Sequence, residues 1–157
     1  MDDKTRQYIL DMSMQENRFG ALYRYLAASF GISACGMWVL YYLFIAEDDI
    51  SQQELMQLMM FPKQTINSAV TGLVKKGYVE LEMIPGTRNR KKIILTKAGR
   101  SFAKDTVCRL QSAESRALGQ MGDKKMKQYI ALHDEYLALL TEEFSEEGLI
   151  SDEYKQE

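Results

Sequence analysis

The sequence predicts a mainly α-helical chain that carries one small β-hairpin. Apolar residues recur at helical spacing over most of the 157 residues, and only two prolines interrupt the chain. Within the segment from Tyr78 to Ile84, the apolar residues Val79, Leu81 and Met83 alternate with Glu80 and Glu82, and Pro85-Gly86 follows as a turn. Since 46% of the residues are hydrophobic, we expect a proper core.

The first third of the chain predicts two helices. The first runs from Asp3 to Phe30, with apolar residues on one face of its second half. Gly31-Ile32-Ser33 ends it, and Ser33 is a suitable N-cap for the next helix, Ala34 to Ala46. Because the second helix is apolar on nearly every side, we expect it at the centre of the core.

A capping box marks the start of a third, short helix. After a polar turn at residues 47–50, Ser51-Gln52-Gln53-Glu54 places a serine and a glutamate at the required spacing. Behind it, Leu55, Leu58 and Met59 form a short apolar stripe. Pro62 ends this helix and suits the first turn of the next.

The fourth helix is expected from Pro62 to Lys76, with Gly77 as its stop. Its two faces differ in chemistry. The apolar face consists of Ile66, Ala69, Val70, Leu73 and Val74, and the polar face of Gln64, Asn67, Ser68, Thr71 and Lys75.

The alternating segment from Tyr78 to Ile84 predicts a half-buried strand, with Val79, Leu81 and Met83 on its apolar side. The chain turns at Pro85-Gly86 and returns as a second strand from Ile93 to Thr96. Between them, residues 87–92 form a polar and basic hairpin tip.

The last third of the chain predicts two further helices. Thr96 is expected to cap a long helix from Lys97 to Leu118. Residues 119–123 break it, and the last helix runs from Lys124 to Phe144 with an apolar seam along one side.

The charge is distributed unevenly along the chain. The formal net charge is −2, yet residues 62–104 hold ten basic and two acidic side chains, which gives +8 there and −10 elsewhere. Charge runs are most often solvated surface, but this block coincides with the fourth helix and the hairpin tip. It therefore indicates an electrostatic footprint for a polyanion.

Other function classes find little support in the sequence. There is no nucleophile–base pairing, phosphate loop or metal cluster, so we expect neither an enzyme nor a cofactor, and the lone His133 cannot form a metal site with its neighbours. No stretch approaches the length of a membrane span, and the N-terminus has no apolar signal core. Cys35 and Cys108 have unrelated spacing, which favours reduced thiols in a cytoplasm.

Two short helices followed by a hairpin with a basic tip constitute a winged helix-turn-helix, which predicts binding to double-stranded DNA. The second helix of such a unit presents polar side chains to base edges in the major groove, and the tip reaches the minor groove or its flanking phosphates. The candidate contacts on the helix are Lys63, Gln64, Thr65, Asn67, Ser68, Thr71 and Lys75. Those at the preceding helix start and the tip are Ser51, Gln52, Thr87, Arg88, Asn89, Arg90 and Lys91.

Alternatives remain open at this point. Taken alone, the polar helix face is equally consistent with an ordinary solvated surface. The basic tip, taken alone, is equally consistent with a solvated turn that keeps a strand edge from aggregating. Winged helices also serve as protein-interaction modules, in which case an acidic partner would occupy the basic block.

The chain resembles the MarR family of bacterial transcriptional regulators over nearly its whole length. The residues that carry the resemblance are Gly31-Ile32-Ser33, Trp38 to Leu43, Ser51 to Leu55, Thr65-Ile66, Leu73 to Val79, and Leu95 to Gly99. The resemblance implies a triangular homodimer with interlocking terminal helices, bound to a palindromic operator and released by a small ligand or oxidant. It implies a ligand-responsive repressor that works in the cytoplasm, on the nucleoid when bound.

The hairpin tip departs from the family pattern. The family's wing commonly carries an Asp two residues before an Arg that enters the minor groove, and those places hold Thr87 and Asn89 here. Arg88 and Arg90 lie on either side of Asn89, so we expect these two arginines to share the groove contact.

The resemblance also divides the chain into a helical dimerisation region, residues 1–33 and 97–157, intertwined with a DNA-binding region, residues 34–96. Apolar seams longer than a winged helix needs favour pairing of two copies, although the terminal helices could instead pack against each other. The candidate dimer residues are Tyr8, Ile9, Tyr129, Leu132, Tyr136, Leu139 and Leu140.

In the family the effector lies between the dimer helices and the DNA-binding lobe. Here Phe19, Tyr23, Trp38, Tyr41 and Tyr42 are candidates for its lining, although plain core packing is the favoured interpretation for each of them. Some relatives sense oxidants through a thiol, but Cys35 has no nearby cation in sequence, which favours a buried structural cysteine.

Overall fold

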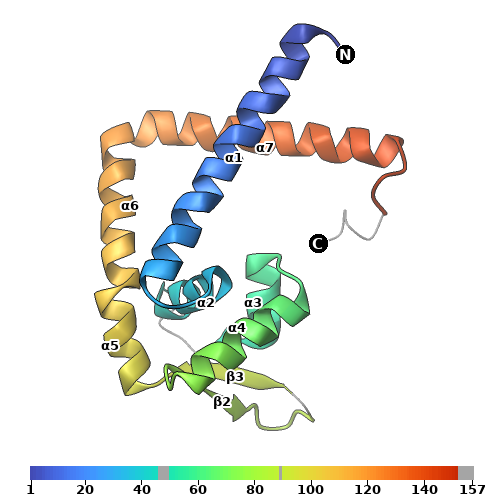
Figure 1. Cartoon of the computed structure of the whole chain (residues 1–157). Coiled ribbons are helices and arrows are strands. Elements are labelled where there is room, and N and C mark those ends of the chain that lie inside the picture. Colours follow the sequence, from blue (N-terminus) through green and yellow to red (C-terminus); the bar gives the residue numbers. More distant parts are fainter. Residues whose placement is uncertain (46–49, 89, 152–157) are drawn as a thin grey trace. The chain divides into compact units, whose positions relative to one another are not determined.

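The computed structural model describes residues 1–45, 50–88 and 90–151, in two compact units, residues 1–108 and 109–157 (Figure 1). The expected end of the second helix at Ala46, most of the polar turn that follows it, and Asn89 lie outside the described residues. Each unit is described separately below.

The first two helices have the expected positions. Helix α1 (Asp3–Ser29) begins at Asp2, whose side chain accepts a hydrogen bond from the Thr5 backbone N–H. Helix α2 (Ala34–Ile45) begins after Ser33, whose Oγ accepts from the Gly36 N–H at 3.0 Å. The expected N-cap role of Ser33 is therefore confirmed.

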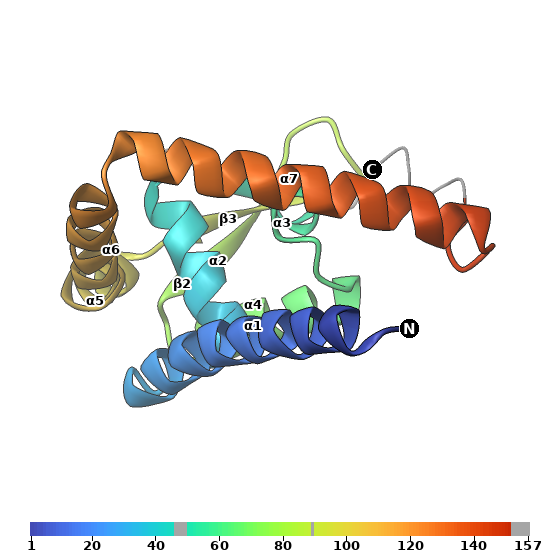
Figure 2. The same cartoon turned by 90° about the horizontal axis from the view of Figure 1, so that it is seen from above.

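Helix α2 is the centre of the core of the first unit, as its uniform apolar character predicts. It contacts α1 on one side (Figure 2). On its other sides it contacts the helices α3 (Gln52–Met59), α4 (Lys63–Lys75) and α5 (Lys97–Asp105) and the strand β3 (Lys91–Leu95). Met37, Val39 and Leu40 are fully buried within it.

The two short helices are α3 (Gln52–Met59) and α4 (Lys63–Lys75). Leu55 is buried as expected, but Leu58 is 54% exposed, so the predicted stripe on α3 is wrong at that position. Because α3 is only eight residues long and turns away at Met60 in the left-handed conformation, one turn of its apolar side lacks cover in the single chain.

The β-sheet has three strands where the sequence predicted two. β1 (Ile50–Ser51) pairs with β3 (Lys91–Leu95), which also pairs with β2 (Val79–Met83), both antiparallel. Residue 50 was expected in a turn, and β3 begins two residues before the predicted return strand. A two-residue strand is too short to show any periodicity in sequence.

Strand β2 is less buried than its alternation predicts. Val79 is buried, whereas Leu81 and Met83 are 37% and 44% exposed. The outer strand of a small sheet has a neighbour on one side only, which leaves these two side chains partly in solvent.

The predicted helix from Lys97 to Leu118 is two helices, α5 (Lys97–Asp105) and α6 (Val107–Met121). The break is at Thr106, whose backbone leaves the helical region (φ −120°, ψ −74°) and whose hydroxyl donates to the Phe102 carbonyl at 2.6 Å. Hydroxyls that bond back to a preceding carbonyl compete with the helical pattern. Thr96 caps α5 as expected, accepting from the Gly99 N–H at 2.9 Å.

The second unit contains most of α6 and all of α7 (Asp123–Glu146). Only Gly122, with φ +78°, separates the two helices, so the predicted break is shorter than residues 119–123. No residue of α7 is buried in the single chain.

Among the described residues, no single helix is long and apolar enough to cross a membrane. Helices α1 and α2 reach the length and apolar composition of a membrane span only when they are counted together, and the chain bends by 84° at the break between them.

Candidate nucleic-acid interface

Helix α4 presents one polar, exposed face. Ile66, Ala69, Val70 and Leu73 are buried against the core, so the helix cannot rotate without exposing them. This burial leaves the opposite side in solvent. All seven candidate contact residues of this helix are exposed: Lys63, Gln64, Thr65, Asn67, Ser68, Thr71 and Lys75.

The start of α3 is held by a complete capping box. Ser51 Oγ accepts from the Glu54 N–H at 3.2 Å, and Glu54 Oε2 accepts from the Ser51 N–H at 2.7 Å. Ser51 is only 4% exposed, so its side chain supports the helix start and is not available at the surface. Its expected role as a DNA contact is therefore corrected to a structural one.

Gln52 joins the two helices of the helix-turn-helix. It is half-buried at the first position of α3, and its Nε2 donates to Oδ1 of Asn67 on α4 at 3.5 Å. Two of the predicted contact residues are thus brought together by the fold.

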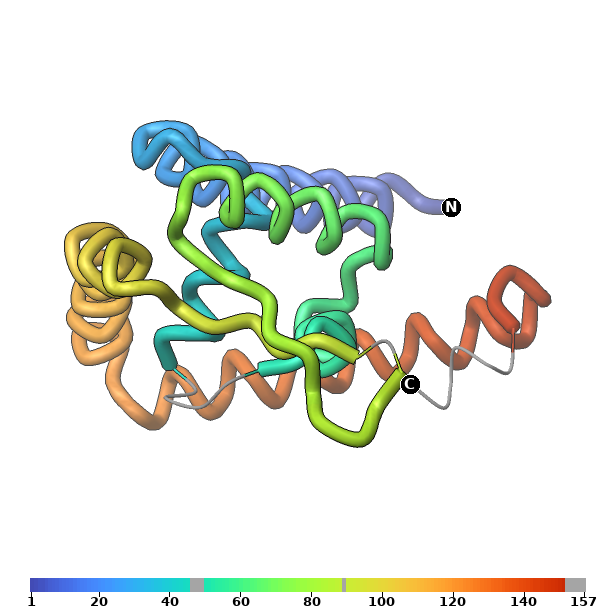
Figure 3. Tube along the Cα trace, turned by 90° about the horizontal axis from the view of Figure 1, so that it is seen from below, coloured from blue at the N-terminus to red at the C-terminus, as the bar shows by residue number. Residues whose placement is uncertain are grey.

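The described part of the loop between β2 and β3, residues 84–88 and 90, extends beyond the strands (Figure 3). We call this loop with its two strands the wing. Thr87 closes the loop, because its Oγ1 donates to the Ile84 carbonyl at 2.8 Å and its N–H donates to the same oxygen at 3.2 Å. Thr87, which was predicted as a DNA contact, therefore stabilises the loop through hydrogen bonds within it.

Three predicted basic contacts of the wing are in solvent: Arg88, Arg90 and Lys91 are exposed. Lys92, by contrast, lies opposite Glu82 in the β2–β3 pairing and forms an ion pair with it at 3.5 Å. The positive charge presented by the wing therefore comes mainly from its two arginines and Lys91.

Glu54 lies within electrostatic reach of the wing. The hydrogen bonds from Ser51 lower the pKa of the Glu54 carboxyl, and the positive charge of Arg90 lowers it further. Sequence reasoning recognised Glu54 only as part of the capping box. Its relation to Arg90 depends on the β1–β3 pairing, for which the sequence gives no signal.

A hollow of about 460 Å³ lies beside the N-terminal turn of α4. Cys35 lines it and is itself buried, with its thiol donating to the Thr65 carbonyl at 3.9 Å. Burial raises the pKa of the Cys35 thiol, which disfavours the reactive thiolate. The other residues that line the hollow are Ser33, Pro62, Gln64, Thr65, Ser68 and Ala69.

The five aromatic residues considered for an effector site form one continuous series of ring contacts. Successive ring centroids lie 4.8 Å (Phe19–Tyr23), 4.9 Å (Tyr23–Trp38), 5.3 Å (Trp38–Tyr41) and 6.0 Å (Tyr41–Tyr42) apart. Phe19 is 62% exposed and the other four are half-buried. Such spacing and tilt are typical of stabilising aromatic pairs, so the series is suited both to core packing and to lining a site.

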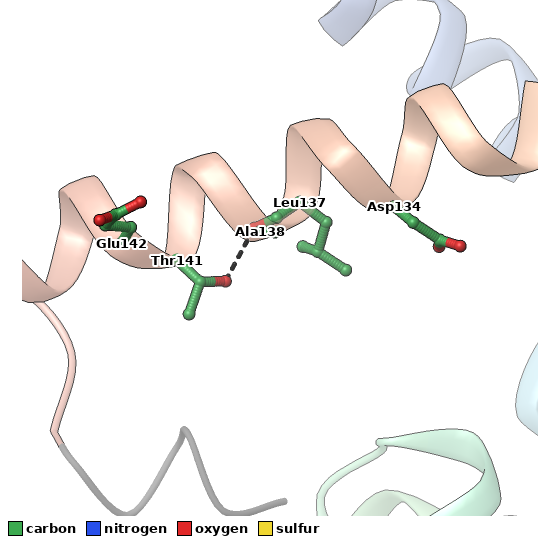
Figure 4. Close-up of a pocket in the computed structure, with 5 residues that line it drawn as sticks. All are labelled: Asp134, Leu137, Ala138, Thr141 and Glu142. Carbon is green, nitrogen blue, oxygen red and sulfur yellow. Dashed lines mark hydrogen bonds between the residues drawn. The ribbon is translucent and has the colours of Figure 1, made fainter.

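The candidate dimer residues are exposed or half-buried in the single chain. On α7, a shallow hollow of about 500 Å³ is lined by residues of that helix alone, as the close-up shows (Figure 4). Thr141 within it donates its hydroxyl hydrogen to the Leu137 carbonyl at 2.8 Å.

The exposed fractions of the candidate dimer residues are 57% for Tyr8, 50% for Ile9, 59% for Tyr129, 58% for Leu132, 36% for Tyr136 and 52% for Leu139, and Leu140 is half-buried.

A capped helix, a second helix with an exposed polar face, and a basic hairpin define a winged helix-turn-helix. Residues 37–88 match the model of the MarR family, which confirms the resemblance over this segment. No curated protein matches the chain.

Solved structures show the same fold over most of the chain. The chain is similar to the MarR family regulator NMB1585 from Neisseria meningitidis, with 19% identity, a TM-score of 0.74 and coverage of 89% of this chain and 98% of that one. The chain is also similar to a MarR transcriptional regulator from Methanosarcina mazei, with 22% identity, a TM-score of 0.63 and coverage of 86% of this chain and 98% of that one. A third similar structure is MepR of S. aureus in a complex with DNA, with 18% identity, a TM-score of 0.68 and coverage of 85% of this chain and 97% of that one. The chain therefore has the winged-helix fold of MarR family regulators.

Proposed function

We propose that the protein is a transcriptional regulator of the MarR family that binds a specific sequence of double-stranded DNA. One observation carries the proposal: the predicted apolar side of α4 is buried at every position except Val74, which is 39% exposed near the helix end, and every predicted base-contacting residue on the other side is exposed. A helix docked in this way fits the major groove with its polar face toward the bases.

The charge distribution supports contact with phosphates. The +8 of residues 62–104 includes Lys63, Lys75 and Lys76 on and after α4, and Arg88, Arg90 and Lys91 on the wing, all of them exposed. Lysine and arginine at phosphates release counterions, which supplies affinity without sequence preference. The polar side chains of α4 supply the preference.

We further propose that two copies bind together on a palindromic site. In support, α7 spans 24 residues without burying one, and α1 buries only Ala27, so their apolar side chains lack cover in a single chain. A two-fold pair would place the two α4 helices about 10 bp apart on one side of the duplex. On this proposal the protein works in the cytoplasm, where the nucleoid lies.

A small effector that regulates binding is the least specified part of the proposal. The aromatic series from Phe19 to Tyr42 supports it, because it offers stacking surfaces that are only partly buried. A ligand there would release DNA only as far as it binds the non-binding arrangement more tightly than the DNA-binding one. Repression is the expected output.

Fluorescence anisotropy tests the proposal. A duplex selected by the protein from a random library is labelled and titrated, and unlabelled selected and random duplexes then compete for the protein. We expect the selected duplex to compete far better than the random one. Equal competition by both contradicts sequence-specific binding.

The same titration separates DNA binding from the protein-interaction alternative, for which the basic surface would also serve. Binding to DNA should weaken with salt, with a log–log slope of about −0.9 for each phosphate contact. If no duplex binds at low salt, the DNA-binding proposal fails and the interaction module is favoured.

A further inference from the structure

The loop of the wing is closed at its base by both backbone groups of Ile84. The Ile84 N–H donates to the Arg90 carbonyl oxygen at 2.9 Å, and the Ile84 carbonyl oxygen accepts from the Thr87 N–H at 3.2 Å. Pro85 and Gly86 occupy the centre of the turn so formed, and the positive φ of Gly86 (+77°) is the one that a type II turn requires. The first half of the loop is therefore a defined turn.

The Thr87 hydroxyl adds a side-chain bond to the same closure. Its Oγ1 lies 2.8 Å from the Ile84 carbonyl oxygen, to which it donates, and 3.5 Å from the Arg90 carbonyl oxygen. Both neighbouring atoms are acceptors, so a side chain in this place has to supply a hydrogen. Threonine does so at little entropic cost, because its β-branched side chain is stiff about χ1.

The closed loop is joined to the helix-turn-helix through the sheet. Arg90 is followed directly by β3, in which Lys92 lies opposite Ser51 of β1. Ser51 is the N-cap of α3, and α3 contacts α4. The base of the loop is therefore connected to both helices by regular hydrogen bonding and packing.

Arg88 and Arg90 extend from this loop with exposed side chains. A long side chain loses conformational freedom when it binds a phosphate, and any backbone that must be ordered at the same time adds to that loss. A loop that is already closed in the free protein avoids the second contribution. A hydrogen-bond donor at position 87 should therefore increase the affinity that the two arginines supply.

We propose that Thr87 is a positioning residue for DNA binding, whose hydroxyl orders the wing loop in the free protein and so presents Arg88 and Arg90 to the DNA backbone. The proposal rests on the proposed function, because it concerns how the wing holds DNA. It replaces the direct contact expected of Thr87 by an indirect role.

Two substitutions separate the hydroxyl from the rest of the side chain. Thr87→Val keeps the β-branched shape and removes the donor, whereas Thr87→Ser keeps the donor. In anisotropy titrations of the full chain with the selected duplex, Thr87→Val should bind about three- to tenfold more weakly than the wild type, which is the effect of one neutral hydrogen bond. Thr87→Ser should remain within about twofold of the wild type.

Thr5→Val is the matched control. It makes the same substitution at the start of α1, where the Thr5 hydroxyl donates to Asp2 Oδ2 at 3.2 Å in an exposed place outside the wing. The affinity of this variant for the selected duplex should equal that of the wild type.

Limited trypsin digestion without DNA measures the order of the loop directly, because trypsin cleaves after arginine. Cleavage of a native loop follows how often the loop opens. Fragments that end at Arg88 or Arg90, identified by mass spectrometry, should form about threefold faster or more from Thr87→Val than from the wild type or Thr87→Ser. Cleavage after Arg116, which is exposed on α6, provides the internal control and should proceed at one rate in all three proteins.

A double-mutant comparison shows whether the effect on binding acts through the arginines. When Arg88→Ala and Arg90→Ala are already present, Thr87→Val should weaken binding no further, because the side chains that it positions are absent. The salt slope of Thr87→Val alone should equal that of the wild type, because its arginines still neutralise phosphates in the complex. A purely structural loss of the wing would lower this slope.

Four results would overturn the inference: Thr87→Val binding as tightly as the wild type, Thr87→Ser binding as weakly as Thr87→Val, equal cleavage of the loop in Thr87→Val and the wild type, or further weakening of the arginine variant by Thr87→Val. The digestion involves no DNA, and in the binding experiments the wild type still prefers the selected duplex to random DNA. Loss of that preference overturns the proposed function instead.

Discussion

Ser51 lies opposite Lys92 in the antiparallel pairing of β1 with β3, so the start of α3 and the returning strand of the wing form one support. The pairing joins the start of the helix-turn-helix to the last strand of the wing through Ser51 and Lys92, which are 41 residues apart in sequence (92 − 51). Stability of this junction should therefore affect both proposed DNA-contacting elements.

Replacing Ser51 by alanine removes the acceptor for the Glu54 N–H and breaks the capping box. We expect a loss of about 1 kcal/mol in the free energy of unfolding. Chemical denaturation measures it, with Gln53→Ala as the control, because Gln53 is exposed on the same turn. Equal stability of the two variants contradicts the capping assignment.

The capping box should also make stability depend on pH. The Ser51 hydrogen bonds, assisted by Arg90, hold the folded-state pKa of Glu54 below its ordinary value of 4.5. The unfolded chain therefore binds the proton more readily, and the contribution of Glu54 is present above pH 4.5 and is lost as pH falls through the folded-state pKa.

Comparison of the wild type with Glu54→Gln isolates this contribution. The difference in unfolding free energy should be largest near neutral pH and should shrink as the pH falls below 4.5. A difference that stays constant across this range means that the Glu54 carboxylate has no favourable interaction in the folded chain.

Gly99 is required where α5 meets the start of β2. A Cβ on Gly99 would collide with the Tyr78 carbonyl oxygen, and the Tyr78 ring is itself stacked on Phe102 with centroids 4.2 Å apart. Gly99→Ala should therefore destabilise the fold by roughly 1–3 kcal/mol.

Gly119→Ala is the control for Gly99→Ala. Gly119 lies within α6 and a Cβ there would meet nothing within 4 Å, so alanine should raise stability by up to about 1 kcal/mol. Thermal unfolding of the two variants should shift in opposite directions. A shift in the same direction contradicts the close approach at Tyr78.

The wing arginines should contribute affinity more than sequence preference. The double variant Arg88→Ala and Arg90→Ala should weaken binding to selected and random duplexes alike, and should reduce the salt slope by about 0.9 for each phosphate that the wing no longer neutralises. Arg116→Ala with Lys124→Ala removes the same charge from α6 and α7 and serves as the control. An unchanged slope in the wing variant removes the wing from the DNA interface.

Cys35 should be unreactive in the native protein. It is buried, it donates to the Thr65 carbonyl, and its pKa is raised by burial, so a thiol reagent should modify it only as fast as the chain opens. The rate is measured in a Cys108→Ser variant, with and without denaturant. Rapid native modification accompanied by loss of DNA binding would instead indicate a redox switch.

The sequence predicted the helices of the DNA-binding region well because their signals are local. The Ser51–Glu54 capping box, Pro62 and Gly77 mark the ends of α3 and α4 within a few residues, and helical spacing separates the two faces of α4. These features do not depend on distant parts of the chain.

The sequence failed where tertiary contacts decide. The pairing of Ile50 with Ile93 creates β1, and Thr106 interrupts a segment whose spacing fits one helix. The inward hydroxyls of Ser51 and Thr87 were predicted as DNA contacts because residue type alone does not show which way a side chain points. The Gln52–Asn67 hydrogen bond joins residues fifteen apart in sequence. It could not be predicted, because residue type alone does not show which way either side chain points.

The account depends on α4 reading base edges in the major groove. Substitution of 7-deazaadenine for adenine in the selected duplex tests this most directly, because it removes the major-groove N7 acceptor and leaves base pairing and the minor groove intact. At the adenine that Asn67 contacts, we predict that the affinity of the wild-type protein falls by roughly fivefold or more. This adenine is recognised as the position at which the Asn67→Ala variant is insensitive to the substitution. Unchanged affinity at every substituted position would contradict the account.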